Sequence, residues 1–147
     1  MIIESKSRLV ARGICIRKHK ILLARSLNSE SYFLPGGGIE DFEGASSCLV
    51  REIKEEIAVT ATIVSFVGVV ENYWEAVDSI TYERNFVFTF EFKKNESVCS
   101  NERDLKFEWI DVTDLEKIDL KPDIMKEAIK QTFFGKNNTF WYSNYIK

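Results

Sequence analysis

The stretch from Gly37 to Val59 constrains the fold most, because a run of glycines leads directly into a segment with helical periodicity. Apolar residues recur there at the spacing of one helix face, so one stripe of the segment can be buried against a sheet. These residues are Leu49, Val50, Ile53 and Ile57. We therefore expect a helix from about Ala45 to Ile57, preceded by a loop whose backbone can approach a ligand closely.

The opposite face of the expected helix carries three carboxylates. Glu52, Glu55 and Glu56 stand at i, i+3 and i+4 and share one sector of the surface. Such a cluster is usually a solvated acidic face. Here the glycines precede it, and Arg51 can orient one carboxylate without removing the net negative charge. The pattern favours a metal site.

The ligands expected at this site are all oxygen atoms. Glu52 and Glu56 are the leading candidates because they lie one helical turn apart, and Glu55 is the third. A backbone carbonyl of the glycine run, such as that of Gly37, would complete the set. Ligands of this kind favour Mg²⁺, with Mn²⁺ as a substitute.

The same stretch resembles the Nudix box of the MutT-like hydrolases. The matching residues are Gly37, Glu43, Arg51, Glu52, Ile53, Glu55, Glu56 and Val59. Ala58 stands where the family usually has glycine, so we expect a changed helix end but no loss of activity. The resemblance implies an α/β/α sandwich, in which a mixed β-sheet lies between helices.

The resemblance also implies a function, namely Mg²⁺-dependent hydrolysis of a diphosphate linkage by attack of activated water at phosphorus. Glu52, Glu55 and Glu56 would bind metal, and Arg51 and Glu43 would support catalysis; contact with a phosphate is a second interpretation of Arg51. The general base is either a box glutamate or a carboxylate elsewhere in the chain, although carboxylates such as these candidates are more often ordinary surface residues. Those candidates are Glu83, Glu102 and Glu108.

The substrate is predicted only as a class, a nucleoside diphosphate linked to another moiety, such as a nucleoside triphosphate or a nucleotide sugar. Basic and aromatic residues outside the box are the candidate contacts. They are Arg12, Arg25, Tyr32, Tyr73, Trp74 and Arg84. The competing interpretation is a non-catalytic module that senses a nucleotide, although every box carboxylate is present.

The length of 147 residues, 45% of them hydrophobic, suits a single domain over residues 1–147. The net charge of -3 argues against binding to duplex nucleic acid, so we expect a small phosphorylated substrate as the partner. Three cysteines without paired spacing indicate reduced thiols and a cytoplasmic protein. We expect neither a signal peptide nor contact with a membrane.

The remaining elements are expected to complete the sandwich. The runs 9–16, 21–24, 32–34, 60–71, 80–92 and 105–112 read as strands, and the polar, aromatic segment 72–79 reads as a connection or a flap. A helical turn should begin at Thr113, and Pro122 should open a C-terminal helix that Gly135 ends. The aromatic tail 137–147 is expected to pack on the domain or to form a homodimer.

Overall fold

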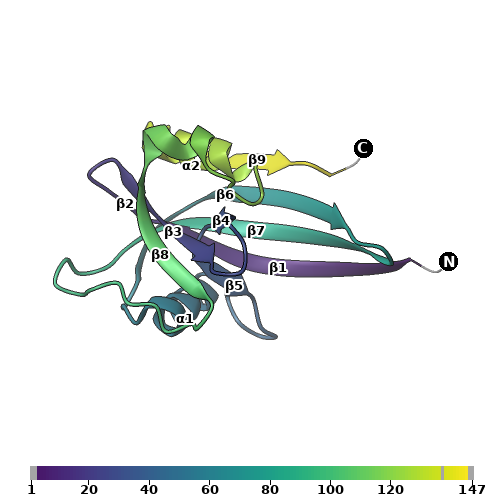
Figure 1. The fold of residues 1–147 in the computed structure, drawn as a ribbon, viewed down its shortest axis with the longest axis horizontal. Coiled ribbons are helices and arrows are strands. Elements are labelled where there is room, and N and C mark those ends of the chain that lie inside the picture. The colour runs from purple at the N-terminus through teal and green to yellow at the C-terminus, as the bar shows by residue number, and fades with distance from the viewer. Residues whose placement is uncertain (1–2, 137, 146–147) are drawn as a thin grey trace.

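A five-stranded mixed sheet runs through the centre of the protein (Figure 1). The computed structural model describes residues 3–136 and 138–145. The strands of this sheet are β1 (Glu4–Ile14), β5 (Gly36–Gly38), β6 (Thr62–Glu75), β7 (Ser79–Glu91) and β9 (Phe140–Ser143). Their order is β5-β1-β7-β6-β9, with β1 parallel to β7 and β6 antiparallel to β7. The glycine run therefore pairs with β1 at one edge of the sheet.

A second sheet continues from the end of β1. It consists of β2 (Ile16–Arg17), β3 (Lys20–Ser26), β4 (Tyr32–Phe33) and β8 (Leu105–Asp111). β3 pairs antiparallel with β2, β4 and β8. Lys18 and His19 both have positive φ, which closes the tight turn between β2 and β3. His19 is exposed in this hairpin.

Helices cover both faces of the central sheet, as Figure 1 shows with α1 (Ala45–Ile57) below and α2 (Met125–Phe133) above. A short 3₁₀ helix, η1 (Val112–Lys117), leads toward α2. Each layer has its own hydrophobic core, one beside α2 and one beside α1. The predicted α/β/α sandwich with a mixed sheet is confirmed.

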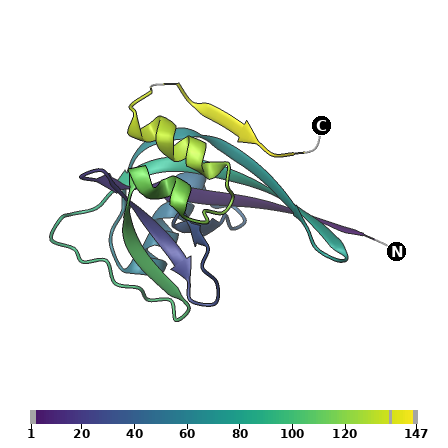
Figure 2. The same cartoon turned by 45° about the horizontal axis from the view of Figure 1, so that its top comes forward.

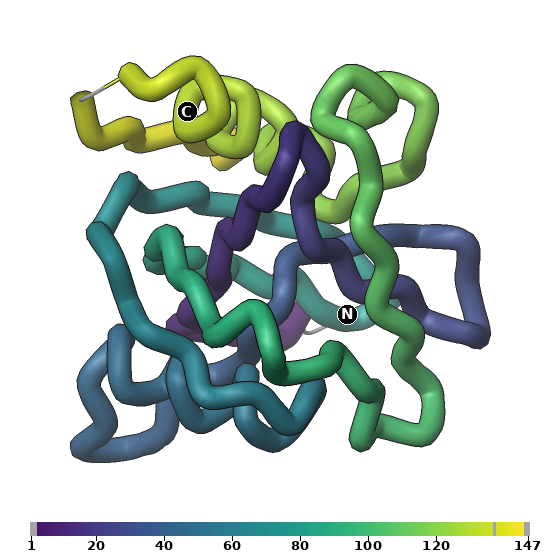
Figure 3. Tube along the Cα trace, turned by 90° about the vertical axis from the view of Figure 1, so that its left-hand side faces the viewer, coloured from purple at the N-terminus to yellow at the C-terminus, as the bar shows by residue number. Residues whose placement is uncertain are grey.

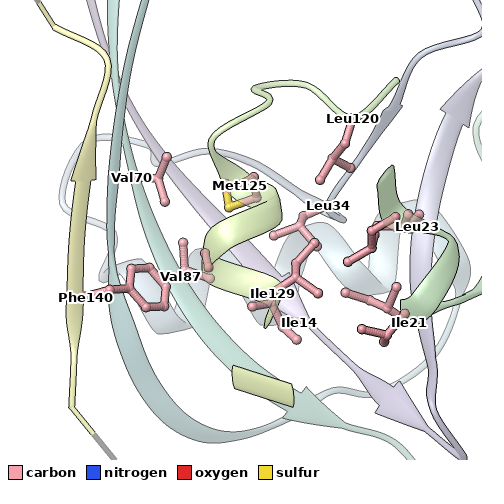
Figure 4. Close-up of a cluster of buried hydrophobic side chains, with 13 residues drawn as sticks. Ile14, Ile21, Leu23, Leu34, Val70, Val87, Leu120, Met125, Ile129 and Phe140 are labelled. Carbon is pink, nitrogen blue, oxygen red and sulfur yellow. The ribbon is translucent and has the colours of Figure 1, made fainter. Parts of the chain in front are cut away.

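The period of two along β3 explains how one strand contributes to both cores. Ile21 and Leu23 point into the core beside α2, whereas Leu22 points into the core beside α1. Figure 4 shows the core beside α2, where Ile129 of α2 meets side chains from the strands and from the tail. Because all of these residues are apolar and buried, the two sheets and α2 hold a fixed relative position.

One local expectation is confirmed and two were wrong. The helical turn expected at Thr113 is η1, which begins one residue earlier and is capped by the side chain of Asp111, which accepts from the amide of Thr113. β6 continues through Tyr73 and Trp74, so the expected connection over 72–79 shrinks to three residues. Pro122 precedes α2 instead of opening it, because the helix begins at Met125.

The end of α1 also differs from expectation. Ala58 adopts the left-handed conformation (φ 60°, ψ 20°) that glycine would adopt there, and its amide donates to the carbonyl of Lys54 at 3.1 Å. The helix therefore ends with the same geometry as a glycine-capped helix, and the expected change in geometry is absent. Instead, the left-handed conformation of Ala58 costs free energy that glycine would not lose.

Residues 138–145 of the tail fold back on the domain, as one of the two expected interpretations stated, whereas residues 137, 146 and 147 lie outside the described residues. β9 pairs parallel with β6 and lies beside α2 (Figure 2). Phe140 is buried in the core beside α2, whereas the Trp141 side chain is 64% exposed. Within the part of the chain that the structure describes, no helix has the length and apolarity needed to cross a bilayer.

Candidate active site

The apolar stripe of α1 fixes the helix with its acidic face toward the glycine run. Leu49, Ile53 and Ile57 are fully buried in the core beside α1. This orientation brings the Glu52 carboxylate so close to Gly37 that a Cβ at Gly37 would lie 2.5 Å from Glu52 Cδ. Any other residue at position 37 would displace that carboxylate. The glycine therefore allows β5 and α1 to pack in direct contact at this point.

Arg51 links the box carboxylates into a network. Its guanidinium donates to both oxygens of Glu43, at 2.7 and 2.9 Å, and to Glu52 Oε1 at 3.0 Å. It also reaches Glu55 Oε2 at 3.3 Å and the carbonyl of Gly38 at 3.2 Å. These hydrogen bonds lower the pKa of Glu43 to about 2 and raise the pKa of Arg51. Arg51 is thus placed to orient Glu52, as the sequence predicted.

Glu56 is the most buried of the box carboxylates, with 6% of the residue exposed. Its Oε2 accepts from the amide of Gly36 at 3.4 Å. Burial raises the pKa of Glu56 to about 8, because the charged form loses its hydration, while the nearby charge of Arg12 opposes the shift. A buried carboxylate of this kind is a marker of functional sites.

Arg12 connects the box to the centre of the sheet. Its Nη1 donates to the carbonyls of Leu34 and Gly36, at 3.1 and 3.2 Å. The carbonyl of Gly36 therefore accepts a hydrogen bond from Arg12, and its amide donates one to Glu56. Burial lowers the pKa of Arg12, and the charges of Glu83 and Glu56 partly offset this effect.

A cavity of about 570 Å³ opens beside Arg12. Arg12, Tyr73 and Trp74, three of the six predicted substrate contacts, line it together. Sequence reasoning missed most of the other lining residues, which come from β4, β6 and the segment before α2. They are Phe33, Asn72, Lys121, Pro122 and Asp123. Asn72 lies two residues from Val70 and from Trp74 on β6, so its side chain points to the same face of the sheet as theirs. This alternation was the one signal in the sequence that could have identified Asn72 as a lining residue.

The other predicted contacts lie elsewhere. Arg25 packs over the ring of Tyr32, whose hydroxyl donates to Glu108 at 2.8 Å, on the second sheet. Arg84 pairs with Glu71 at 3.1 Å and packs over Tyr145. Because side chains alternate along β7, Arg84 points to the face opposite Glu83 and does not line the cavity.

The three carboxylates considered as general bases occupy different surroundings. Glu83 is buried, lines the cavity and pairs with Arg8 at 3.2 Å. Glu108 accepts from Tyr32 and pairs with Lys106, which lowers its pKa. Glu102 lies in a loop whose Asn101 amide donates to the carbonyl of Glu56 at 2.8 Å. The charge of Glu102 contributes to the raised pKa of Glu56. Of the three candidates for general base, Glu102 is therefore the one that lies in a loop beside α1.

The box carboxylates do not form a closed cage. In residues 3–136 and 138–145, no group of three or more His, Cys, Asp or Glu side chains is close enough to hold a metal ion. Glu52 and Glu56 face the glycines, whereas the Glu55 side chain is 54% exposed and turns toward Arg51.

Comparison with solved structures supports the fold. UDP-X diphosphatase superimposes with a TM-score of 0.75 at 20% identity, over 92% of this chain and 67% of that one. The MutT protein of Bacillus halodurans has a TM-score of 0.75 at 19% identity, over 93% and 91%. The ORF135 protein of E. coli has a TM-score of 0.66 at 22% identity, over 90% and 94%.

The family model for the NUDIX domain matches residues 7–132. The predicted class, a hydrolase acting on phosphoric anhydrides, is confirmed at the level of the family. Because the match spans most of the chain, from β1 to the last turn of α2, this protein belongs to the Nudix hydrolase family.

Proposed function

We propose that this protein is a Mg²⁺-dependent hydrolase that cleaves the diphosphate linkage of a nucleoside diphosphate joined to another moiety. One observation carries the proposal: Gly36 joins the buried carboxylate of Glu56 to Arg12, which lines the 570 Å³ cavity. A substrate bound in that cavity would hold its diphosphate next to the box carboxylates.

The residues around the glycine run fit a hard divalent cation. Glu52, Glu56 and the carbonyl of Gly37 offer oxygen ligands only, which Mg²⁺ prefers and Mn²⁺ accepts. The buried Glu56 makes no ion pair within 4.0 Å among the described residues, so a cation bound beside it would favour its ionised form. Glu55 is exposed and pairs with Arg51, and we assign it as the third metal ligand, whose side chain has room to change its rotamer.

The chain's own residues would prepare the substrate for attack. Mg²⁺ held by Glu52, Glu55 and Glu56 would supply charge neutralisation at the diphosphate and would lower the pKa of a water molecule. Arg51, fixed by both oxygens of Glu43, holds Glu52 in place, and Arg12 places positive charge between the carboxylates and the cavity. A box glutamate or Glu102 would accept the proton of the attacking water, because these carboxylates lie at the box helix.

The cavity suits the moiety beyond the diphosphate. Phe33, Tyr73 and Trp74 offer aromatic surface on which a base can stack, and Asn72 and Lys121 offer polar contacts. The names of two structural neighbours, UDP-X diphosphatase and an ADP-ribose pyrophosphatase from Streptococcus suis, are consistent with this class of substrate.

A panel of nucleoside-diphosphate compounds tests the proposal. Purified protein is incubated with nucleoside triphosphates, oxidised forms included, and with nucleotide sugars, in Mg²⁺, in Mn²⁺ and in excess EDTA. We expect a nucleoside monophosphate from at least one compound with either metal and none with EDTA. In H₂¹⁸O the label should enter a phosphate product, because water attacks phosphorus.

Two outcomes would contradict the proposal. Label found only in the non-phosphate moiety would mean that another bond breaks. Tight binding of a nucleotide without turnover of any compound would favour the alternative, a non-catalytic nucleotide sensor.

A further inference from the structure

A second cavity, of about 640 Å³, lies at the end of the molecule that carries the β2–β3 hairpin. Its lining comes from this hairpin and the end of β1, from β6, from β7 and the segment after it, and from the end of α2. Figure 3 looks onto this end and shows the hairpin reaching toward α2, with the segment after β7 below it. The cavity shares no lining residue with the one beside Arg12, and no box carboxylate lines it.

The rim of this cavity is cationic. Arg17, Lys18 and Lys94 line it, with Glu91 as the one carboxylate, although the chain as a whole carries a net charge of -3. Within residues 3–136 and 138–145, none of the three cations has a carboxylate within 4.0 Å. Three like charges at one cavity repel each other, and a bound anion would relieve that repulsion.

Arg17 is the cation of this rim that is held in a defined position. The Arg17 guanidinium packs 3.9 Å from the ring centroid of Phe92 and 5.6 Å from that of Trp109, and it donates to the carbonyl of Phe92. Lys18 stands in the tight turn, where its φ is 50°. Arg17 therefore loses little further freedom when it binds an anion.

The wall behind the rim is apolar. Ile16, Val64 and Phe133 present apolar surface to the cavity, over the buried side chains of Ile14 and Phe90. The His19 ring packs against that of Phe133, with 5.6 Å between the ring centroids. The volume is within the range of sites for small organic ligands. A hydrated inorganic anion would leave the apolar wall in contact with water. An apolar body attached to an anionic group would cover the wall, and burial of apolar surface would favour its binding.

We propose that this second cavity binds an amphipathic anion, a small molecule with an apolar body and a single carboxylate or phosphate group. The apolar body lies against Ile16, Val64 and Phe133, and the anionic group lies at Arg17, Lys18 and Lys94. The site is independent of the proposed hydrolysis, since the two cavities have no residue in common.

Titration of ¹⁵N-labelled full-length protein with octanoate, octyl phosphate and octyltrimethylammonium tests this site. We expect both anions to shift the amide signals of residues 14–19 and 89–94 in a saturable manner, and the cation to leave them unchanged. The comparison of octanoate with octyl phosphate shows which anionic group the rim prefers.

Two double variants with the same change in net charge provide the control. Lys18→Glu/Lys94→Glu reverses two rim charges, whereas Lys20→Glu/Lys93→Glu reverses exposed neighbours that do not line the cavity. We expect about tenfold or greater weakening in the first variant and little change in the second. Equal weakening in both variants, equal binding of the cation, or no saturable shift of these segments with either anion would overturn the proposal.

Discussion

At the scale of single residues, the candidate site depends on how each glutamate of the Nudix box is surrounded. Glu43 and Glu52 form ion pairs with Arg51, Glu55 is exposed, and Glu56 is buried beside Gly36. Identical side chains a few residues apart therefore differ in the free-energy cost of carrying a charge. Two predictions concern these residues.

Glu56→Gln keeps the volume of the side chain but removes a charge from the proposed metal site. We expect turnover of the best substrate with Mg²⁺ to fall by about 100-fold or more, because a charged ligand contributes several kcal/mol to the transition state. Glu127→Gln, on the exposed face of α2, should retain full turnover. Unchanged turnover of Glu56→Gln would remove Glu56 from the metal site.

The ion pair of Glu43 with Arg51 makes stability depend on pH. The pKa of Glu43 is about 2 in the folded protein, below its ordinary value of 4.5, so ionised Glu43 stabilises the fold above pH 4.5. This contribution is lost as the pH falls toward 2. In thermal unfolding, Glu43→Gln should therefore lower Tm at pH 7, and the difference from the wild type should shrink between pH 4.5 and pH 2. A difference in Tm that is constant with pH would refute the assignment.

At the scale of elements, the site is an assembly of β5 against α1. The buried stripe of α1 sets the rotation of the helix, and the glycines of β5 let it come close. Both features are local in sequence, which explains why the bounds Ala45–Ile57 were predicted correctly.

Gly37 and Gly38 form a matched pair for testing this contact. A Cβ at Gly37 would lie 2.5 Å from the Glu52 carboxylate carbon, whereas a Cβ at Gly38 would meet no atom within 4 Å. We expect Gly37→Ala to reduce turnover by about 10- to 100-fold through displacement of Glu52, and Gly38→Ala to behave as wild type. Equal activities of the two variants would show that Glu52 need not lie at this position.

The end of α1 offers a test of stability. Because Ala58 is left-handed, Ala58→Gly should raise the free energy of unfolding by about 1 kcal/mol, measured with urea. The same substitution at Ala45, in the first turn of the helix, should lower it by up to about 1 kcal/mol. Activity should persist in both variants.

At the scale of the whole molecule, the tail completes the core beside α2. Phe140 of β9 packs against Gly68, where a Cβ would collide with its ring, and it joins residues of β6, β7 and α2. The predicted homodimer stays a prediction.

Phe140→Ala should lower the free energy of unfolding by about 3 kcal/mol, because it removes a buried aromatic ring. Trp141→Ala, at the exposed position next to it, should cost much less. Urea denaturation of both variants measures the difference, and similar losses would mean that β9 is held by its backbone pairing alone.

The sequence by itself determined what depends on local spacing: the helix, its acidic face, Arg51 among the carboxylates, and the family. These follow from the 3.6-residue period and from residues a few positions apart. Tertiary structure alone decided that Arg12 of β1, Trp74 of β6 and Lys121 before α2 line one cavity, and that Arg25, Tyr32 and Arg84 do not. Strand order and register bring such distant residues together, and no local pattern encodes either of them.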